Sequence, residues 1–338
     1  MTTVPTRVAM VQRHPRPGFH SIETVFRTVA CAFPEEIRAE LHVSPFPSRG
    51  LWNRVRAARA AGRAMRGTRA EVAHVLGDAH YLVFGLPRRR TVLTVHDCDF
   101  LTGKRGLRRF LLWLIWLYLP MRFCAVATTI SERTRSDLVA LSGCDPDHVR
   151  VIPNPLPARF RPAPPAAHER PRILHIGTKA NKNLPRLIAA LAGLDVELTI
   201  IGRLTVSHEQ QIAQAGLAVR NLVDLSDVAL VEAYWACSLV AFVSTSEGFG
   251  MPIIEAQATG RPVLTSDILP MSDVAGGAAL LVDPLDIEAI RSAVLRLINA
   301  PALRDRLIAA GLDYVRRFEP RQVARSYAAL YRELAARA

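Results

Sequence analysis

Residues 244–262 read STSEGFGMPIIEAQATGRP, and together with the residues just before them they predict a strand, a turn and a helix. The apolar run at 239–243 directly before it predicts a buried strand of a parallel sheet. A glycine-rich turn follows at 247–250, Pro252 suits the first turn of a helix, and Gly260 suits its end. A strand, a glycine turn and a helix start in this order form a corner where backbone N–H groups and the helix dipole favour an anion such as phosphate.

Two glutamates flank this corner. Glu247 lies in the turn and Glu255 lies one turn into the expected helix. A single acidic residue near a helix start is common because it complements the helix dipole. Two of them, with glycines and a proline between, are more specific, and carboxylates accept hydrogen bonds from hydroxyl groups. The stretch therefore predicts a ligand with both phosphates and hydroxyls, such as a nucleotide sugar.

The length and composition favour a two-domain protein of the cytoplasm. A chain of 338 residues is long for one hydrophobic core. The longest apolar run, residues 110–120, is too short to span a bilayer, and residues 1–10 lack the apolar core of a signal peptide. The five cysteines have no metal-type spacing, which indicates reduced thiols. We expect a cytoplasmic location, with contact to the cytoplasmic membrane face left open.

The positive charge is concentrated in the first half of the chain. Residues 1–160 hold 24 Lys and Arg against 12 Asp and Glu, whereas residues 161–338 hold 19 against 18. Such a field attracts anionic membranes, nucleic acid or acidic substrates. An arginine-rich genome would produce the same composition without any such partner.

Short apolar runs and helical periodicity predict alternating strands and helices in the first half. The expected strands are 7–12, 41–44, 71–77, 91–95, 125–130 and 149–153, and the expected helices include 21–32, 52–69 and 104–120. The arginines of 52–69 are spread around that helix, which favours a solvated element. The segment 104–120 has a basic start and a tryptophan-bearing apolar body, so it is either a core helix or a membrane-interface helix.

A proline-rich segment at 159–171 breaks this periodicity and predicts a domain linker. The second half then alternates strands at 173–176, 196–201, 222–224, 239–243, 262–265 and 279–282 with helices at 184–191, 208–215, 228–236, 253–259 and 287–299. This alternation predicts α/β domains with parallel, doubly wound sheets. We expect domains at 1–160 and 161–318, a helix at 319–338 packing back toward the first domain, and a ligand cleft between the domains.

Two cations follow strands of the second domain. Lys182 follows Gly177-Thr178 after the strand at 173–176, and Arg203 follows Gly202 after the strand at 196–201. Both are expected at the sheet edge that carries the 247–250 turn, where two cations and a helix start could neutralise a diphosphate.

The chain also contains two Asp-x-Asp pairs of the kind that metal-dependent transferases use. Asp145 and Asp147 have the pattern of turn residues, and Asp97 and Asp99 follow a strand. Because cations are already available for the phosphates, we expect no metal and no cofactor. The absence of a GxGxxG fingerprint argues against a dinucleotide oxidoreductase.

These residues resemble a known family. VSTSEGFGMPIIEAQATGRPVLTSD, followed by AGGAALLVDPLD, closely resembles the retaining GT-B glycosyltransferases of the large family-four type, whose signature is two glutamates separated by seven residues, here Glu247 and Glu255. IGTKANKNLPRLIAAL and IIGR resemble the cation-bearing phosphate segments of that family. TVLTVHDC, TTISERTRSDL and VIPNP resemble its N-terminal domain, and HVLGDAHYL resembles a polysaccharide-assembling subgroup. The resemblance covers most of residues 70–300.

The resemblance implies a role for each matching residue. Glu255 would hold the ribose hydroxyls of the donor nucleotide, Glu247 would bind hydroxyls of the donor sugar, and His96 would lie near the transferred sugar. Lys182 and Arg203 would stabilise the leaving diphosphate. Further donor contacts are expected from Thr178, Gly248, Phe249, Gly250, Met251 and Leu225, and acceptor contacts from Gly18, His20 and His80.

Three departures from the family pattern affect these roles. The glycine-rich first loop of many members is reduced to Pro17-Gly18-Phe19-His20, which weakens the acceptor assignment. Asn181 stands where many members have arginine. Arg203 stands where lysine is frequent, which keeps the charge but changes the geometry of its hydrogen bonds.

The function implied is metal-independent, retaining transfer of a hexose such as mannose or glucose. The donor would be a UDP- or GDP-sugar, and the acceptor a saccharide or lipid-linked hydroxyl in the synthesis of cell-surface polysaccharide or lipopolysaccharide. Two alternatives remain open: a sugar-nucleotide epimerase or hydrolase of the same fold, and a basic nucleic-acid-binding protein. The chain lacks the aromatic residues interleaved with cations that proteins use to bind single-stranded nucleic acid, which argues against the second alternative.

Overall fold

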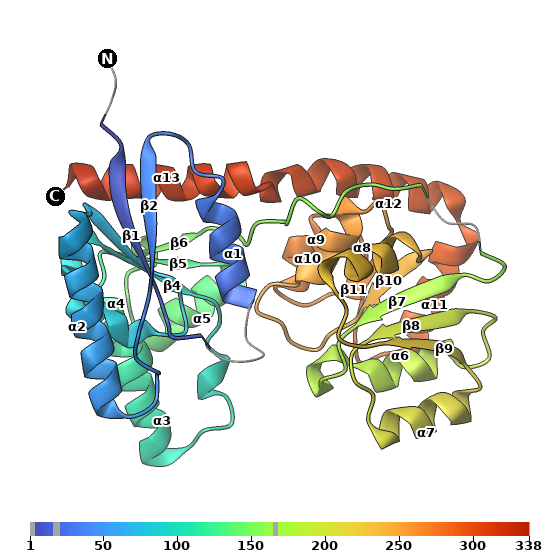
Figure 1. Ribbon diagram of the computed structural model, residues 1–338. Coiled ribbons are helices and arrows are strands. Elements are labelled where there is room, and N and C mark those ends of the chain that lie inside the picture. Colours follow the sequence, from blue (N-terminus) through green and yellow to red (C-terminus); the bar gives the residue numbers. More distant parts are fainter. Residues whose placement is uncertain (1–3, 16–20, 165–167, 338) are drawn as a thin grey trace. The chain divides into compact units, whose positions relative to one another are not determined.

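The computed structural model describes residues 4–15, 21–164 and 168–337, and the chain forms two compact units (Figure 1). Unit 1 comprises Met1–Pro155 together with Phe318–Ala338, and unit 2 comprises Leu156–Arg317. Each unit is built on a six-stranded sheet in which every strand pair is parallel. The predicted α/β, doubly wound class is confirmed.

The sheet of unit 1 has the strand order β2-β1-β3-β4-β5-β6. Its strands are β1 (Thr6–Gln12), β2 (Ile37–Val43), β3 (Val72–Val75), β4 (Thr91–Val95), β5 (Val126–Thr129) and β6 (Val149–Val151). The expected strand at 41–44 was too short and began too late. β2 is an edge strand with alternating exposed residues, so its first half lacks a continuous apolar run.

The helices of unit 1 differ from expectation at one point. They are α1 (Ser21–Ala30), α2 (Leu51–Thr68), α3 (Gly106–Trp113), α4 (Leu119–Arg122), α5 (Glu132–Ser142) and α13 (Pro320–Ala336). The helix expected at 104–120 runs without a gap through α3 and α4, but its middle, Leu114–Tyr118, is a π-helical turn. Within the described ranges no helix is long and apolar enough to cross a membrane.

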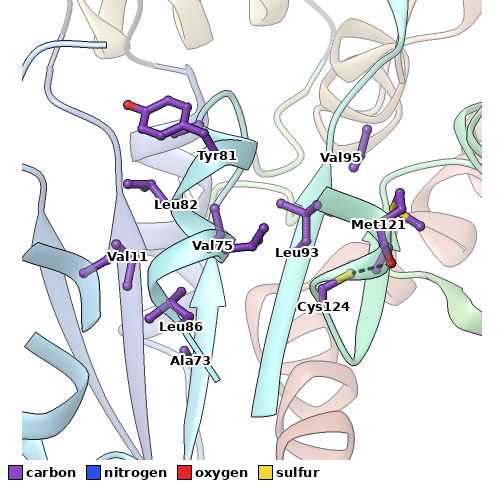
Figure 2. Packing of buried hydrophobic residues seen from close by; sticks show 14 of the residues in the cluster. Val11, Ala73, Val75, Tyr81, Leu82, Leu86, Leu93, Val95, Met121 and Cys124 are labelled. Atoms are coloured by element: carbon purple, nitrogen blue, oxygen red, sulfur yellow. Dashed lines mark hydrogen bonds between the residues drawn. The ribbon is translucent and has the colours of Figure 1, made fainter. Parts of the chain in front are cut away.

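Two apolar clusters cover the two faces of this sheet. On one face, strand residues such as Val75 and Leu93 pack with Leu82, Leu86 and Met121 beneath α2 and the π-helical turn (Figure 2). On the other face, Phe26 of α1 packs with Tyr327 and Tyr331 of α13. The C-terminal helix α13 is thus part of the core of unit 1.

The sheet of unit 2 has the order β12-β11-β10-β7-β8-β9. Its strands are β7 (Arg172–Ile176), β8 (Glu197–Ile201), β9 (Ala218–Leu222), β10 (Leu239–Phe242), β11 (Val263–Ser266) and β12 (Leu280–Val282). Its helices are α6 (Leu184–Leu191), α7 (Val206–Ala215), α8 (Asp227–Trp235), α9 (Met251–Ala258), α10 (Met271–Ala275), α11 (Ile287–Asn299) and α12 (Pro301–Tyr314).

Two assignments in unit 2 need correction. The strand expected at 222–224 lies earlier, as β9, and Leu222 is its last residue. β9 is an exposed edge strand that contains Arg220 and Asn221, so no apolar run marks it. Helices α10 and α12 were not expected, because α10 has only 5 residues and the apolar residues of α12 do not form a marked stripe.

Candidate functional site

The carboxyl ends of four neighbouring strands of unit 2 form one edge of its sheet. The strands β10, β7, β8 and β9 are adjacent and parallel, so the loops that follow them emerge together. These loops carry Glu247 after β10, Lys182 after β7, Arg203 after β8 and Asp224 after β9. In open α/β sheets this edge is where ligands bind.

Lys182 and Glu247 form an ion pair at this edge. The distance from Lys182 Nζ to Glu247 Oε1 is 2.6 Å, and the two side chains are only 19% and 14% exposed. The ammonium group also lies 4.8 Å from the centre of the Phe242 ring, a cation–π contact. The structure therefore joins two residues that sequence analysis had assigned to separate parts of a ligand.

The loop after β7 is tied to the Glu247 loop by a second side chain. Asn181 Nδ2 donates to the carbonyl oxygen of Ser246 over 2.8 Å and to Glu247 Oε1 over 3.4 Å. Thr245 N donates to the carbonyl oxygen of Asn181 over 2.8 Å. The residue that departs from the family pattern thus holds Glu247 in place by hydrogen bonding.

Gly177 gives the lysine stem its space. Its φ of +94° lies in the left-handed region, and a Cβ added there would lie 2.9 Å from Lys182 Cγ. Any larger residue would displace the lysine or strain the backbone.

Arg203 lies on the surface of the same edge. Its side chain is 78% exposed and forms an ion pair with Asp224. Thr178 Oγ1 donates to the backbone oxygen of Arg203 over 2.8 Å, which connects the ends of β7 and β8. The guanidinium can leave Asp224 at little cost, because exposed ion pairs contribute only about 0–1 kcal/mol.

Glu255 lies in the second turn of α9 and is half-buried. The hydroxyl of Tyr234, which is fully buried on α8, donates to Glu255 Oε2 over 2.7 Å. Burial raises the pKa of Glu255, whereas the Tyr234 hydrogen bond, Arg159 and Lys182 lower it. A carboxylate in this setting gains from a ligand that donates hydrogen bonds to it.

Tyr234 and Arg159 were missed by sequence analysis. Arg159 pairs with Asp227 over 3.2 Å, and Phe160 contacts the Tyr234 ring edge-on at 5.5 Å. Arg159 lies in the proline-rich segment read as a linker, and Tyr234 has the appearance of a core aromatic residue. Only the fold places them beside Glu255, so the sequence held no signal for either.

The turn before α9 has the geometry expected of it. Gly250 is the residue before the helix and has a φ of +108°, a conformation that favours glycine. Phe249 is buried, and Met251 and Pro252 begin the helix. No side chain of the described residues caps this helix start. Leu225 lies half-buried in the loop between β9 and α8.

In unit 1, His96 follows β4 at the carboxyl edge of that sheet. Its Nε2–H donates to the carbonyl oxygen of Leu76 over 3.2 Å, which leaves Nδ1 as the acceptor in the neutral ring. Gly77 has a φ of +99°, and a Cβ there would lie 2.5 Å from the His96 ring. Burial lowers the pKa of His96, so the ring is neutral at physiological pH.

His96 borders a cavity of about 270 Å³ within unit 1. The cavity is lined by Asp78, His80, His96, Asp97, Phe100, Leu112 and Trp116. His80 is buried, its Nδ1–H donates to the Trp116 carbonyl oxygen over 2.5 Å, and burial lowers its pKa. Gly18 and His20, the other expected acceptor residues, lie outside the described residues.

Two charged contacts shape this cavity. Asp78 forms a 2.6 Å ion pair with Arg13, which is only 3% exposed. Burial raises the pKa of Asp97, whose Oδ1 accepts the backbone N–H of Asp99 over 3.0 Å, as in a turn. Among the described residues no group of three or more His, Cys, Asp and Glu is placed to hold a metal ion.

Two family models match the chain. Residues 11–160 match the model described as Glycosyltransferase Family 4, and residues 158–313 match the model described as Glycosyl transferases group 1. Together they cover both units except the ends of the chain.

Several curated proteins are similar in sequence. The O-antigen chain mannosyltransferase B of Escherichia coli is 26% identical over 261 residues, which cover 70% of this chain and 68% of that protein. The phosphatidyl-myo-inositol mannosyltransferase of Mycobacterium leprae is 31% identical over 176 residues, or 48% of this chain and 46% of that protein. The matched stretch thus spans about two thirds of the first relative and under half of the second.

Solved structures share the fold. Anabaena HepE, solved in complex with UDP-glucose, has a TM-score of 0.77 and 16% identity, and the match covers 97% of this chain and 99% of that one. The sucrose-phosphate synthase of Thermosynechococcus elongatus has a TM-score of 0.76 and 17% identity, covering 98% and 100%.

Proposed function

Because the chain belongs to the GT-B glycosyltransferases of the family-four type, we propose that it moves a hexose from a UDP- or GDP-sugar to a hydroxyl of a saccharide or lipid-linked acceptor. The reaction would retain the anomeric configuration, need no metal, and serve cell-surface polysaccharide synthesis. The observation that carries this proposal is the Lys182–Glu247 pair at the carboxyl edge of unit 2, close to the start of α9 and to Glu255. One relative named as an O-antigen chain mannosyltransferase and another named as a serotype-specific mannosyltransferase support it.

On the donor side, one set of groups stabilises the charge of the diphosphate and another set binds the hydroxyl groups. When the bond between the sugar and the phosphate breaks, negative charge develops on the diphosphate. Lys182, the N–H groups at the start of α9 and Arg203 stabilise that charge. Glu255 accepts hydrogen bonds from the ribose hydroxyls, and Glu247 accepts hydrogen bonds from hydroxyls of the sugar. The leaving phosphate oxygen takes the proton of the attacking acceptor hydroxyl on the same face.

The Lys182–Glu247 pair prepares both groups for this task. Before donor binds, each side chain neutralises the other, so neither is an unpaired charge in a mostly buried setting. On binding, the ammonium turns toward phosphate oxygens and the carboxylate keeps its hydrogen bond from Asn181. Glu247 is therefore a positioning residue for the sugar and for Lys182.

The acceptor half uses the cavity of unit 1. Its aromatic side chains, Phe100 and Trp116, can pack against the apolar face of a sugar ring. Asp78 and Asp97 can accept hydrogen bonds from sugar hydroxyls. His96, neutral and with Nδ1 as acceptor, is suited to a hydroxyl donor.

A thermal-shift screen with UDP-, GDP-, ADP- and dTDP-sugars tests the donor assignment. A donor that binds the native state raises the unfolding temperature, and the rise grows with the logarithm of the donor concentration relative to its dissociation constant. We expect the largest shift from a UDP- or GDP-sugar, and the same shift and turnover in excess EDTA. No shift with any sugar nucleotide would contradict the proposal. Abolition of turnover by EDTA would reinstate Asp97 and Asp99 as metal ligands.

Arg203→Ala tests the second cation. Because the side chain is exposed and screened by solvent, we expect turnover to fall only about three- to tenfold, with a small change in donor affinity. Steady-state kinetics with saturating donor measures this. Arg220→Ala, an exposed arginine on β9, is the matched control and should leave turnover unchanged. Equal effects of both changes would remove Arg203 from the site.

A further inference from the structure

Large apolar side chains are exposed on two helical segments of unit 1. At the start of α2, Leu51 is 71% and Trp52 is 79% exposed, and on α3 Leu107 is 71% exposed. We define the docking face as Leu51, Trp52, Leu107, Phe110, Leu111 and Ile115, all of which are exposed. A tryptophan open to solvent over most of its surface is costly in water and typical of an interaction surface.

The two segments lie at the same edge of the unit. α2 follows β2 and α3 follows β4, and both strands belong to one parallel sheet, so both helices come after the same edge of that sheet (Figure 1). A direct contact joins the start of α2 to the π-helical turn that continues α3, because the Arg54 guanidinium lies 4.5 Å from the centre of the Trp116 ring. The same edge carries His96 and the cavity of unit 1.

The charged residues in the stretches of sequence that contain the docking face are all positive. Residues 41–70 contain seven arginines and residues 100–131 contain five Lys and Arg, and neither stretch contains an Asp or Glu. Lys104 and Arg105 lie directly before α3, and Arg108 and Arg109 lie within it between Leu107 and Phe110. The excess positive charge of the first 160 residues is thus carried by the two segments that expose apolar side chains.

The helical segment of α3 and the π-helical turn has two faces of different kinds. On its inner face Leu117 is fully buried, Trp113 Nε1 donates to the Leu141 carbonyl oxygen over 2.6 Å, and Trp116 lines the cavity. Its outer face carries Phe110, Ile115 and the cations. The inner face confirms the core-helix interpretation of residues 104–120, and the membrane-interface interpretation stays a prediction for the outer face.

We propose that the docking face binds the surface of an anionic phospholipid bilayer. A bilayer interface accepts the apolar side chains and the tryptophan in the acyl boundary and pairs the flanking cations with lipid phosphates. A second copy of the chain would bring like charges together, and nucleic acid would leave the leucines and isoleucine in water. An anionic bilayer accounts for both the exposed apolar side chains and the cations around them.

This surface would place the acceptor cavity at the membrane. Trp116 lines the cavity on the inner side of the helix whose outer side carries Ile115 and Phe110. A saccharide attached to a membrane lipid would then reach the cavity while its lipid stays in the bilayer. Only this last step rests on the proposed function, whereas the docking face stands on exposure and charge alone.

Vesicle co-sedimentation of the full chain tests the proposal. We expect binding to phosphatidylcholine vesicles that contain phosphatidylglycerol, binding that weakens as salt rises, and little binding to phosphatidylcholine alone. The double change Trp52→Ala and Phe110→Ala should lower the partition coefficient at least about tenfold. Arg108→Glu with Arg109→Glu should abolish the preference for anionic lipid.

Matched controls lie in unit 2. Val228→Ala with Leu285→Ala, and Arg296→Glu with Arg306→Glu, also change exposed side chains and should leave vesicle binding unaltered. The thermal shift with donor should be normal in all four variants, so a docking failure differs from a failure of donor binding. Absence of vesicle binding, equal losses in the controls, or a Trp52-dependent dimer or DNA complex in its place would overturn the proposal.

Discussion

Lys182→Ala is expected to lower turnover about 100- to 1,000-fold, the loss typical of removing one group that stabilises charge in a transition state. The lysine is held at the strand edge by its packing on Gly177, its ion pair with Glu247 and its contact with the Phe242 ring. A charge fixed in this way needs no reorganisation when the diphosphate leaves. Donor affinity should change far less than turnover, because the full charge develops only as the bond breaks.

The measurement is a comparison of kcat with the donor dissociation constant for variant and wild type. Lys179→Ala is the matched control, since Lys179 is an exposed lysine three residues earlier in the same loop. The variant also leaves Glu247 without its cation, so a thermal melt must establish that unit 2 remains folded. A normal turnover, or a fall no larger than that of Lys179→Ala, would remove Lys182 from the mechanism.

The sequence predicts those strands that are buried on both faces. β4, β7 and β10 were located within a residue or two, because a central parallel strand leaves a continuous apolar run. β9 was displaced and β2 shortened for the opposite reason, since edge strands expose alternate residues. The periodicity of the sequence does not show which strands are edge strands, because that depends on the order of the strands in the sheet.

The candidate site divides in a similar way. The positions of Glu247, Lys182 and Arg203 follow from local sequence, because each lies in the short loop after an apolar strand, with a glycine in the same loop. Their partners do not. Glu247 and Lys182 are 65 residues apart and meet only because β7 and β10 are neighbours in the sheet. No pattern within either loop encodes that register.

Glu255→Gln is expected to weaken donor binding about 10- to 150-fold, the range for losing hydrogen bonds to a charged group. Glutamine keeps an acceptor for the Tyr234 hydroxyl, so the fully buried tyrosine is not left unpaired, as it would be with alanine. Isothermal titration with the donor found in the thermal-shift screen measures the loss. Glu288→Gln, an exposed acid in the first turn of α11, should bind donor normally.

The same change should raise stability, and the direction follows from the pKa. Burial raises the pKa of Glu255 in the folded state, so the native protein holds this proton more tightly than the unfolded chain. The stabilising contribution of Glu255 is therefore complete below its ordinary pKa and is lost as the pH rises through the folded pKa. Glutamine stays neutral at every pH, so the variant should unfold at a higher temperature than wild type at neutral pH, with the difference vanishing in acid. A variant that is less stable at neutral pH would show that the ionised carboxylate stabilises the fold. Higher stability with weaker donor binding would instead mean that Glu255 is kept ionised for its ligand, at a cost to the fold.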